Sequence, residues 1–233
     1  MWWFRATHAN LLLLYEFFAQ SGAAGRVLDA GCGTGGLLTR LTARLRNSSV
    51  VGLDADAFAC ARAAAKSSCP VCTGSVNSLP FADRSFDAVF SADVLCHEGV
   101  EEAAALAEFR RCLTDDGLLL LNLPAYEWML SRHDRAVANV RRYDRNSVAD
   151  LLSMAGFRVL FAGYWNAFLF PVMVLTRKLL PGGGDSASDV RLYPAPVEAA
   201  CRGVTGLESL LLKRGIGLPF GGSLLAVAAK QEA

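Results

Sequence analysis

The sequence predicts an α/β fold in which helices cover both faces of an open, mostly parallel β-sheet. Short apolar segments alternate along the chain with segments of helical periodicity. This alternation is the pattern of parallel strands joined by crossover helices. One strand, 27–29, runs into the glycine-rich turn 31–36, an arrangement typical of the ligand-binding edge of such sheets. The two observations together predict a sheet with a binding site at its carboxyl edge.

The individual elements follow in chain order from the hydrophobic pattern. An amphipathic helix is expected over about 7–20, and a second helix over about 35–46 after the glycine turn. Asp56 is expected to be the N-cap of the third helix, because aspartate accepts hydrogen bonds from the first helical turn. The remaining strands are expected at 49–54, 71–76, 86–92, 118–123, 157–164 and 224–229, and the remaining helices at 56–66, 100–112, 146–155 and 196–214.

Length and composition predict a single domain over 1–233, in which 1–24 forms an N-terminal helix or cap. The formal net charge is +1, and without a basic stripe or an aromatic RNA-binding motif we expect no nucleic-acid partner. The longest apolar run, 167–175, contains Pro171 and is too short to cross a bilayer. Since the N-terminus also lacks the pattern of a signal peptide, we expect a cytoplasmic protein.

Seven cysteines are scattered along the chain. An odd number of cysteines on expected core elements indicates reduced thiols. Cys69 and Cys72 form a lone C-x-x-C pair with no second pair or nearby histidines, so zinc binding is not expected. We interpret the pair as two small residues at the entrance of a strand, and no metal site is predicted from it.

The glycine turn alone leaves the ligand open. Gly31, Gly33 and Gly36 satisfy the G-x-G-x-x-G pattern of dinucleotide-binding domains. Asp54 ends the next strand about 20 residues later, where a carboxylate can accept both hydroxyls of a ribose. A nicotinamide-dependent oxidoreductase fits these features as well as other users of nucleotide-like cofactors do.

Further residues narrow the choice. Asp29 precedes a Gly-Cys-Gly-Thr-Gly core, and two later signatures stand at 78–87 and 113–117. Together these motifs, within residues 25–125, resemble the class I S-adenosylmethionine-dependent methyltransferases, near the small-molecule group that includes quinone-biosynthesis methyltransferases. The resemblance implies a Rossmann-like sheet of order 3-2-1-4-5-7-6 with an antiparallel last strand, and S-adenosyl-L-methionine as cofactor.

The same resemblance assigns cofactor-binding positions in this chain. The glycines are expected around the methionine half, Asp29 near its ammonium group, Asp54 at the ribose, and the backbone near Ser91 at the methionine and sulfonium. Ser75 stands where the family often has an acid that contacts adenine, so only the neighbouring backbone of Val76 is expected to reach the ring. The cofactor-binding set is Asp29, Gly31, Gly33, Gly35, Asp54, Ser75, Val76 and Ser91.

The N-terminal aromatic residues resemble the opening of a bacterial subgroup of these enzymes. Trp3 and Arg5 are therefore expected to close over the cofactor, because the face of an aromatic ring attracts a cation such as a sulfonium. Alternatively, the indoles only attach the first helix to the body of the protein. Both interpretations remain open.

Three residues are candidates for catalysis. His133 has Asp134 beside it in sequence and could act as a base near neutral pH. Tyr143 could donate a hydrogen bond to the acceptor, or anchor the core. His97 matches a histidine common after this strand in related enzymes, where it contacts substrate or packs. Some of those enzymes bind a metal here, but Cys96 replaces an expected acid, so no metal is predicted.

Two segments, 125–145 and 166–221, exceed the minimal scaffold of the family. Loops at the carboxyl ends of strands shape the ligand site of open α/β sheets, so these segments are expected to form the acceptor pocket and its lid. The second contains a Gly/Ser-rich linker at 182–189, and an apolar stretch that ends at Arg177 and Lys178. Cations beside an apolar face suit a peripheral membrane contact, whereas the same face could be an ordinary core or subunit contact.

The predicted function is transfer of a methyl group from S-adenosylmethionine to a small, apolar acceptor, lipid-like or aromatic, by in-line displacement. O-methylation is favoured over N- or C-methylation. The alternatives are a non-catalytic module that binds the same cofactor and, if the cofactor assignment is wrong, a nicotinamide-dependent oxidoreductase. The sequence leaves the acceptor and the oligomeric state open.

Overall fold

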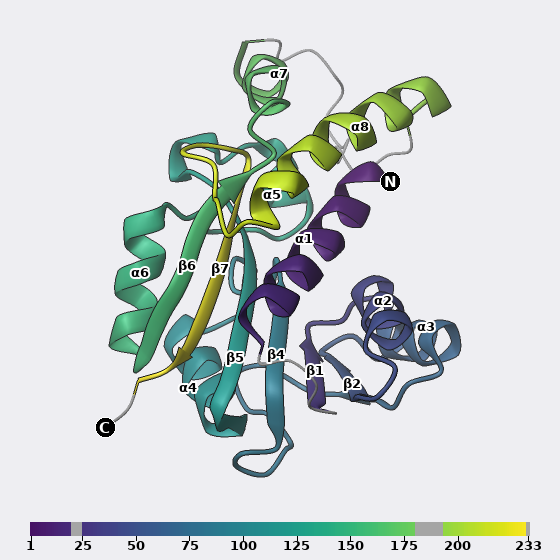
Figure 1. Ribbon diagram of the computed structural model, residues 1–233, viewed down its shortest axis with the longest axis vertical. Coiled ribbons are helices and arrows are strands. Elements are labelled where there is room, and N and C mark those ends of the chain that lie inside the picture. Colours follow the sequence, from purple (N-terminus) through teal and green to yellow (C-terminus); the bar gives the residue numbers. More distant parts are fainter. Residues whose placement is uncertain (20–24, 180–192, 232–233) are drawn as a thin grey trace.

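The computed structural model describes residues 1–19, 25–179 and 193–231. Within them, seven strands form one sheet in the order β3-β2-β1-β4-β5-β7-β6 (Figure 1). The strands β1 to β5 pair in parallel, whereas β7 is antiparallel to both of its neighbours. The predicted Rossmann-like order is thereby confirmed. The strands are β1 Arg26–Ala30, β2 Ser49–Asp54, β3 Val71–Thr73, β4 Phe86–Ala92, β5 Leu113–Pro124, β6 Phe157–Trp165 and β7 Ser223–Lys230.

Helices cover both faces of the sheet, as predicted. On one face α1, α2 and the end of α8 bury Leu11, Leu41 and Leu212 against the strands. On the other face α4 and α6 bury Phe109 and Leu152. The helices are α1 Trp2–Phe18, α2 Gly36–Arg44, α3 Ala57–Ser67, α4 Glu102–Cys112, α5 Arg132–Ala136, α6 Arg145–Met154, α7 Phe170–Val174 and α8 Ala195–Leu212, with a 3₁₀ turn η1 Glu127–Met129 and a π-helical turn η2 Leu175–Leu179.

Three boundaries differ from the sequence-based expectation by more than two residues. Helix α1 begins at Trp2, before the expected residue 7, and Trp3 within it stacks on Trp165. Strand β3 ends at Thr73, since a turn with a bridge between Ser75 and Ser78 follows. Strand β5 begins at Leu113, before the expected residue 118, because Leu113 already pairs with Phe86 ahead of a shift in register. Tertiary pairing therefore sets these ends.

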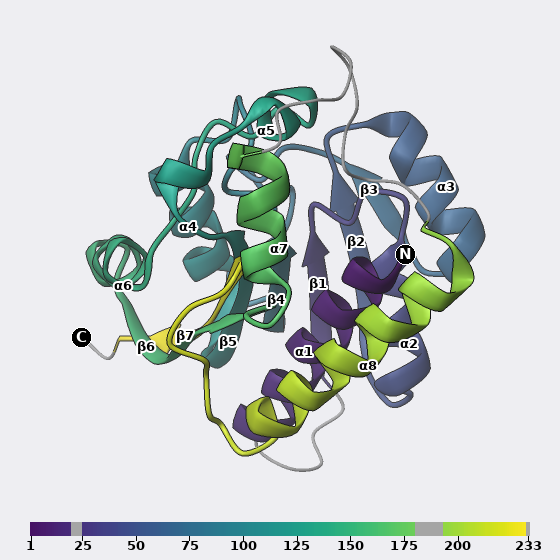
Figure 2. The ribbon, with the colours of Figure 1, turned by 90° about the horizontal axis from the view of Figure 1, so that it is seen from above.

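The two added segments contribute several helical elements to the described residues. Helix α5 belongs to the first, and α7, η2 and α8 belong to the second. Helices α8 and α1 lie side by side (Figure 2), where Ser209 Oγ donates to Asn10 Oδ1 at 2.7 Å. Buried Glu208 on α8 accepts the backbone N–H groups of Asn166 and Phe168, so α8 also holds the chain between β6 and α7. The predicted linker 182–189 lies outside the described residues.

Candidate active site

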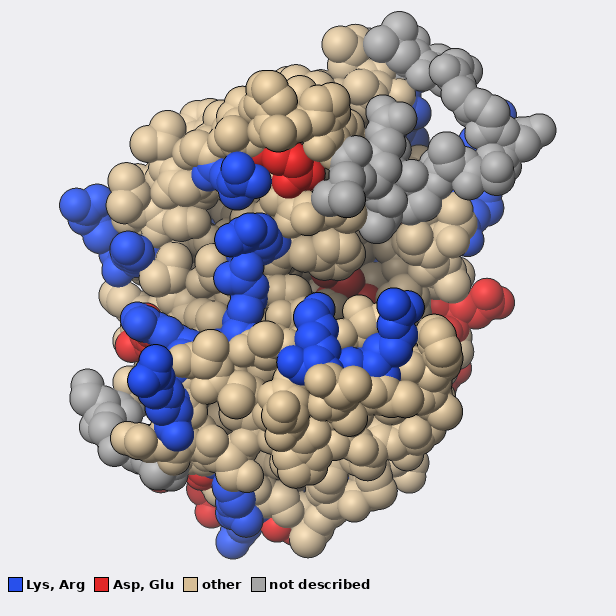
Figure 3. Space-filling model, turned by 90° about the vertical axis from the view of Figure 1, so that its right-hand side faces the viewer, with Lys and Arg blue, Asp and Glu red and all other residues tan. Residues whose placement is uncertain are grey.

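A cavity of about 800 Å³ lies where the parallel strands end. Its lining includes residues at the carboxyl ends of three neighbouring strands. Gly31 directly follows β1, Asp93 directly follows β4, and Pro124 is the last residue of β5. The remaining wall comes from the start of α1, from α5, from α7 and its continuation, and from α8. Figure 3 shows lysine and arginine side chains gathered around a hollow on the side of α2 and α3. The two added segments and the glycine turn therefore share one cavity.

The glycine turn depends on left-handed backbone conformations. Gly31, Gly33 and Gly35 have φ values of +84°, +51° and +78°, which side chains other than glycine adopt at a cost. A Cβ atom at Gly31 would lie 2.2 Å from a methyl group of Val94, and one at Gly35 would lie 2.8 Å from the backbone of Ala63. A Cβ atom at Gly33 would meet no heavy atom within 4 Å.

These contacts divide the glycines by role. Gly31 and Gly33 line the cavity, and the open space beside Gly33 leaves room for a ligand to approach the backbone. Gly35 does not line it but lets α2 pack closely on α3. Its predicted contact with the cofactor stays a prediction.

Asp29 places a buried carboxyl group in the cavity wall. Its side chain is 1% exposed, and its Oδ2 atom has no hydrogen-bond partner among the described residues. Burial raises the pKa of Asp29 to about 7; a hydrogen bond from the backbone of Leu38 opposes this rise, and the negative charge of Asp54 adds to it. A buried carboxylate oxygen of this kind favours a cationic ligand group, because only a partner compensates the loss of hydration.

Asp54 and Asp56 occupy different positions after β2. The two carboxylate oxygens of Asp54 accept the backbone N–H groups of Gly33 at 2.8 Å and Asp56 at 3.0 Å. Each oxygen retains capacity for a further hydrogen bond, although Asp54 is not among the residues that line the cavity. The side chain of Asp56 accepts the N–H of Phe58 at 2.8 Å, which confirms it as the N-cap of α3.

The other predicted cofactor contacts lie outside the lining of the cavity. Ser75 is exposed and its Oγ accepts the N–H of Asn77, whereas Val76 is buried. Ser91 is buried within β4, and its Oγ lacks a partner among the described residues. Arg5 is exposed on α1. None of these four residues borders the cavity directly, and their predicted roles stay predictions.

The N-terminal helix contributes a wall that the sequence only partly predicted. Trp3 lines the cavity and stacks on buried Trp165, with ring centroids 6.1 Å apart. The indole of Trp3 therefore both attaches α1 and faces the site. His8, which the sequence analysis did not select, also lines the cavity, and burial lowers its pKa to about 3. The imidazole of His8 is consequently neutral at physiological pH.

On the side of the first added segment, a buried ion pair contributes to the wall. Arg142 Nη2 lies 2.7 Å from Asp134 Oδ1, and both side chains are at most 3% exposed. The other carboxylate oxygen of Asp134 accepts from the N–H and Oγ of Ser131. Burial alone would raise the pKa of Asp134, but hydrogen bonds from Arg142 and Ser131 and the charge of Arg142 lower it overall. Asp134 thus holds Arg142 in the wall.

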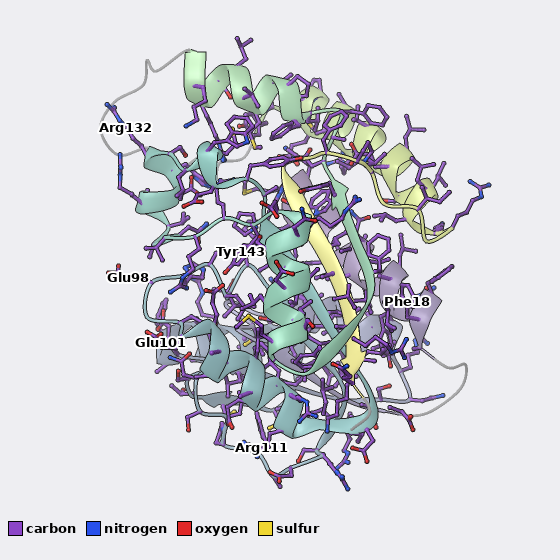
Figure 4. All side chains as sticks on the ribbon, turned by 90° about the vertical axis from the view of Figure 1, so that its left-hand side faces the viewer. Phe18, Glu98, Glu101, Arg111, Arg132 and Tyr143 are labelled. Carbon is purple, nitrogen blue, oxygen red and sulfur yellow. The ribbon has the colours of Figure 1, made fainter. Side chains whose placement is uncertain are left out.

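The three predicted catalytic residues are not brought together. His97 and His133 line the cavity, whereas Tyr143 does not. The hydroxyl of Tyr143 donates to Glu102 at 2.7 Å or to the carbonyl of Leu95 at 3.0 Å, and Figure 4 places this residue well inside the molecule. Burial and Glu102 raise the pKa of Tyr143 far above its usual range. Tyr143 therefore anchors the core here, while its catalytic role, like those of the histidines, stays a prediction.

Asp93 is a side chain in the cavity that the sequence analysis missed. Both of its carboxylate oxygens accept from Asn122 Nδ2, at 2.9 and 3.0 Å. Burial raises the pKa of Asp93 to about 7, against the opposing effects of Asn122 and of the charge of Arg142. The available signal was a lone acid at the carboxyl end of a strand.

Two further observations concern metals and membranes. Among the described residues, no group of three or more histidine, cysteine, aspartate or glutamate side chains is placed to hold a metal ion. All seven cysteines are free, and Cys96 Sγ donates to Asn139 Oδ1 at 3.2 Å. In the part of the chain that the structure describes, none of the helices combines the length and apolar character needed to cross a membrane.

Comparison with known proteins shows which family this sequence resembles. Residues 28–121 match the protein family described as "Methyltransferase domain". The chain is 29% identical to 24-methylenesterol C-methyltransferase 2 of Oryza sativa subsp. japonica over 60% of its own length and 43% of that protein. It is 30% identical to malonyl-[acyl-carrier protein] O-methyltransferase of Methylovorus sp. over 71% of its own length and 62% of that protein. Residues 28–121 therefore form a methyltransferase domain, in agreement with the class I S-adenosylmethionine-dependent methyltransferases that the sequence motifs resemble.

The fold agrees with this family. Geranyl diphosphate C-methyltransferase from Streptomyces coelicolor A3(2) superposes with a TM-score of 0.64, covering 95% of this chain and 78% of that one at 15% identity. The chain spans only about half the length of the curated relatives that it matches. The family assignment settles the cofactor as S-adenosyl-L-methionine and excludes the nicotinamide alternative.

The residues of this methyltransferase fit its methyl donor. The unpartnered oxygen of Asp29 suits the ammonium group of the methionine part, and the open space at Gly33 suits a ligand that lies against the backbone. Asp54 retains acceptor capacity for ribose hydroxyls beside the same turn. The aromatic face of Trp3 in the wall suits a positively charged sulfonium.

Proposed function

We propose that this methyltransferase transfers the methyl group of S-adenosylmethionine to an oxygen atom of a small, apolar acceptor. The observation that carries the proposal is that one cavity joins the glycine turn to an apolar wall. Leu169, Val172 and Met173 of the α7 region line it together with Trp3 and with Gly31 of the turn. An apolar lining with a few placed polar groups is typical of sites for small molecules.

The reaction needs alignment more than activation. S-adenosylmethionine supplies a methyl group that is already activated by its sulfonium. The glycine turn and Asp29 hold the cofactor, the α7 wall holds the acceptor, and α1 and α7 together exclude water. Alignment of two reactants can contribute about 7–11 kcal/mol to lowering the barrier. We place His97 and His133 on the acceptor side, where either could exchange a proton with the acceptor.

The relatives support a small-molecule acceptor but differ in the atom that is methylated. One is named a sterol C-methyltransferase and the other a malonyl-[acyl-carrier protein] O-methyltransferase. We favour oxygen because protonatable side chains, His97, His133 and Asp93, border the acceptor side of the cavity. A hydroxyl acceptor must lose its proton during methyl transfer, and protonatable side chains of this kind can accept that proton.

The experiment is methyl transfer from radiolabelled S-adenosylmethionine to a panel of apolar phenols, alkyl carboxylates and sterols. The variant Asp54→Ala should weaken cofactor binding by about 1–3 kcal/mol, because it removes charge-assisted hydrogen bonds. The matched control Asp56→Ala removes only a helix cap and should leave cofactor affinity within about twofold, at a cost of ~1 kcal/mol in stability. Cofactor binding without transfer to any acceptor would favour the non-catalytic module instead.

We further propose that the acceptor is lipid-like and enters from a membrane surface. Phe168, Val172 and Leu175 are 59%, 58% and 46% exposed beside Arg177 and Lys178. Val172 also lines the cavity, so the same short helix borders both the site and the solvent. An exposed apolar face flanked by cations suits anionic headgroups. A core or subunit contact of the same face is the alternative.

Liposome flotation tests this membrane contact. Wild-type protein should float with vesicles that contain anionic lipid at low salt, and Arg177→Glu/Lys178→Glu should reduce the bound fraction. The control Arg84→Glu/Arg158→Glu changes two exposed arginines at the opposite edge of the sheet and should float like wild type. Wild-type protein that stays wholly in the unbound fraction would remove the membrane proposal while leaving methyl transfer intact.

A further inference from the structure

We infer that Asp93 takes the proton from a hydroxyl group of the acceptor, and that Asn122 is the positioning residue that orients its carboxylate. The inference rests on the proposed function, since it names the proton acceptor for O-methylation. It assigns to Asp93 the role of base that the sequence analysis suggested for His133.

Asp93 lies between the cofactor side and the acceptor side of the cavity. Asp93 directly follows β4, and the next residue, Val94, packs so closely on the glycine turn that a Cβ atom at Gly31 would lie 2.2 Å from it. Asp93 lines the cavity together with Gly31 on one side and His97 and Arg142 on the other. The carboxylate therefore stands at the junction of the cofactor and acceptor sides, where the reacting oxygen and methyl group must meet.

The orientation of Asp93 is fixed through two buried residues. Trp165 Nε1 donates to Asn122 Oδ1 at 2.8 Å, and an indole N–H is only a donor. The amide of Asn122 must therefore direct its Nδ2 group to Asp93, whose two oxygens accept at 2.9 and 3.0 Å. The backbone N–H of Asp93 also donates to the carbonyl of Asn122 at 2.8 Å. Asn122 and Trp165 are both fully buried, so the carboxylate has a fixed support behind it.

The proton affinity of Asp93 suits a base that works near neutral pH. Burial raises its pKa to about 7, although the hydrogen bond from Asn122 and the charge of Arg142 lower it. The groups around it are Arg142, which is paired with Asp134, the thiol of Cys96, the imidazole of His97, and Asp29 on the neighbouring strand β1. Burial and the charge of Asp93 keep the Cys96 thiol protonated by raising its pKa far above its usual value. A base with a pKa near the working pH is the most effective.

The backbone of Asp93 is held in a conformation that few residues adopt. Its φ of +58° lies in the left-handed region, which costs a side chain other than glycine about 1–2 kcal/mol. Asparagine and aspartate tolerate this region better than other side chains. Asp93→Asn therefore keeps the shape and the backbone conformation, while the carboxylate that accepts the proton is lost.

In the proposed step, removal of the acceptor's proton accompanies methyl transfer. The O–H bond of the acceptor breaks and its proton passes to an oxygen of the Asp93 carboxylate. The acceptor oxygen forms a bond to the methyl carbon as the bond between that carbon and sulfur breaks, and the electron pair of this bond stays on sulfur. Protonated Asp93 later releases its proton to water. An acceptor that is already ionised, such as a carboxylate, needs no such transfer.

This difference between acceptors defines the kinetic test. With 4-nonylphenol as acceptor, Asp93→Asn should lower kcat about 10²–10⁴-fold, and the limb of the pH–rate profile near pH 7 should disappear. With decanoate as acceptor, the same variant should lower kcat less than about tenfold. Asn122→Leu should move the limb to higher pH, because it removes a donor that favours the ionised carboxylate. The control Asp115→Asn, on an exposed acid early in β5, should match wild type.

The outcomes separate this inference from the proposed function. Failure to methylate any phenol or carboxylate contradicts the proposed function. Methylation of 4-nonylphenol by Asp93→Asn at the wild-type rate, or loss of the limb in His133→Ala but not in Asp93→Asn, contradicts the role of Asp93. Nuclear magnetic resonance of protein labelled with ¹³C at the aspartate carboxyl gives a readout that needs no acceptor. The resonance absent from Asp93→Asn should titrate near pH 7, and a midpoint near 4 would overturn the inference.

Discussion

The two sides of the cavity are built by different means. On the cofactor side, the turn after β1 keeps its shape through backbone conformations that glycine allows, at Gly31 and Gly33. On the acceptor side, the wall keeps its shape through side chains, above all the buried pair of Arg142 and Asp134. A change on the cofactor side should act through local backbone strain, and a change on the acceptor side through loss of a charged side-chain partner.

The largest effect is expected on the acceptor side. Arg142→Met leaves the carboxylate of Asp134 buried without its cation, which should lower the free energy of unfolding by about 3–5 kcal/mol. The double variant Arg142→Met/Asp134→Leu removes both charges and should recover most of that loss, because no uncompensated charge remains. Urea unfolding monitored by circular dichroism measures both. Equal losses in the two variants would mean that packing, rather than charge, holds this wall.

The glycine turn offers a matched pair of variants. Gly31→Ala combines a left-handed φ with the contact to Val94 and should cost about 3–4 kcal/mol. Gly33→Ala has a left-handed φ but open space around it, and should cost about 1 kcal/mol. The same unfolding experiment compares them. If Gly33→Ala were the more damaging in the absence of ligand, strain at the turn would not follow the contacts described here.

Asp29 gives a pH-dependent prediction with a definite sign. Its pKa is about 7 in the folded protein and about 3.9 when unfolded. The folded state therefore binds the proton more tightly, and ionisation of Asp29 destabilises the protein progressively as pH rises from about 4 to 7. Asp29→Asn should be about as stable as wild type at pH 4 and roughly 4 kcal/mol more stable at pH 8 without cofactor.

The same substitution should weaken binding of S-adenosylmethionine, because the ammonium group loses a charged partner. Unfolding at several pH values and titration calorimetry test the two halves of this prediction on one variant. Asp93, whose pKa is also raised, makes the free energy of unfolding depend on pH in both wild type and Asp29→Asn. The difference in stability between the two proteins therefore reports on Asp29 alone. A variant that is no more stable than wild type at pH 8 would show that Asp29 is already compensated in the free protein.

The smallest effect is expected at Tyr143. Tyr143→Phe removes the hydrogen bond to Glu102 and should lower the free energy of unfolding by about 1 kcal/mol. Because the hydroxyl faces the core, turnover should change little. A loss of turnover greater than tenfold at nearly unchanged stability would restore the role that the sequence suggested for it.

The sequence alone determined the fold class, the strand order through the family resemblance, and the glycine turn. These features depend on local patterns: alternating apolar segments, glycines at left-handed positions, and Asp56 at a helix start. Such features can be predicted from the sequence because each depends on interactions between residues that are close together in the chain.

Only the tertiary structure decided which side chains meet in the cavity. Asn122, Trp165 and Asp93 are far apart in sequence, yet one hydrogen-bonded series joins them. Asp134 follows His133 directly in sequence but binds Arg142, eight residues further along the same connection between β5 and α6. Tyr143 lies two residues beyond Arg141 on the same segment and still turns into the core. Long-range pairings of this kind depend on how β4, β5 and β6 align, which no local pattern in the sequence records.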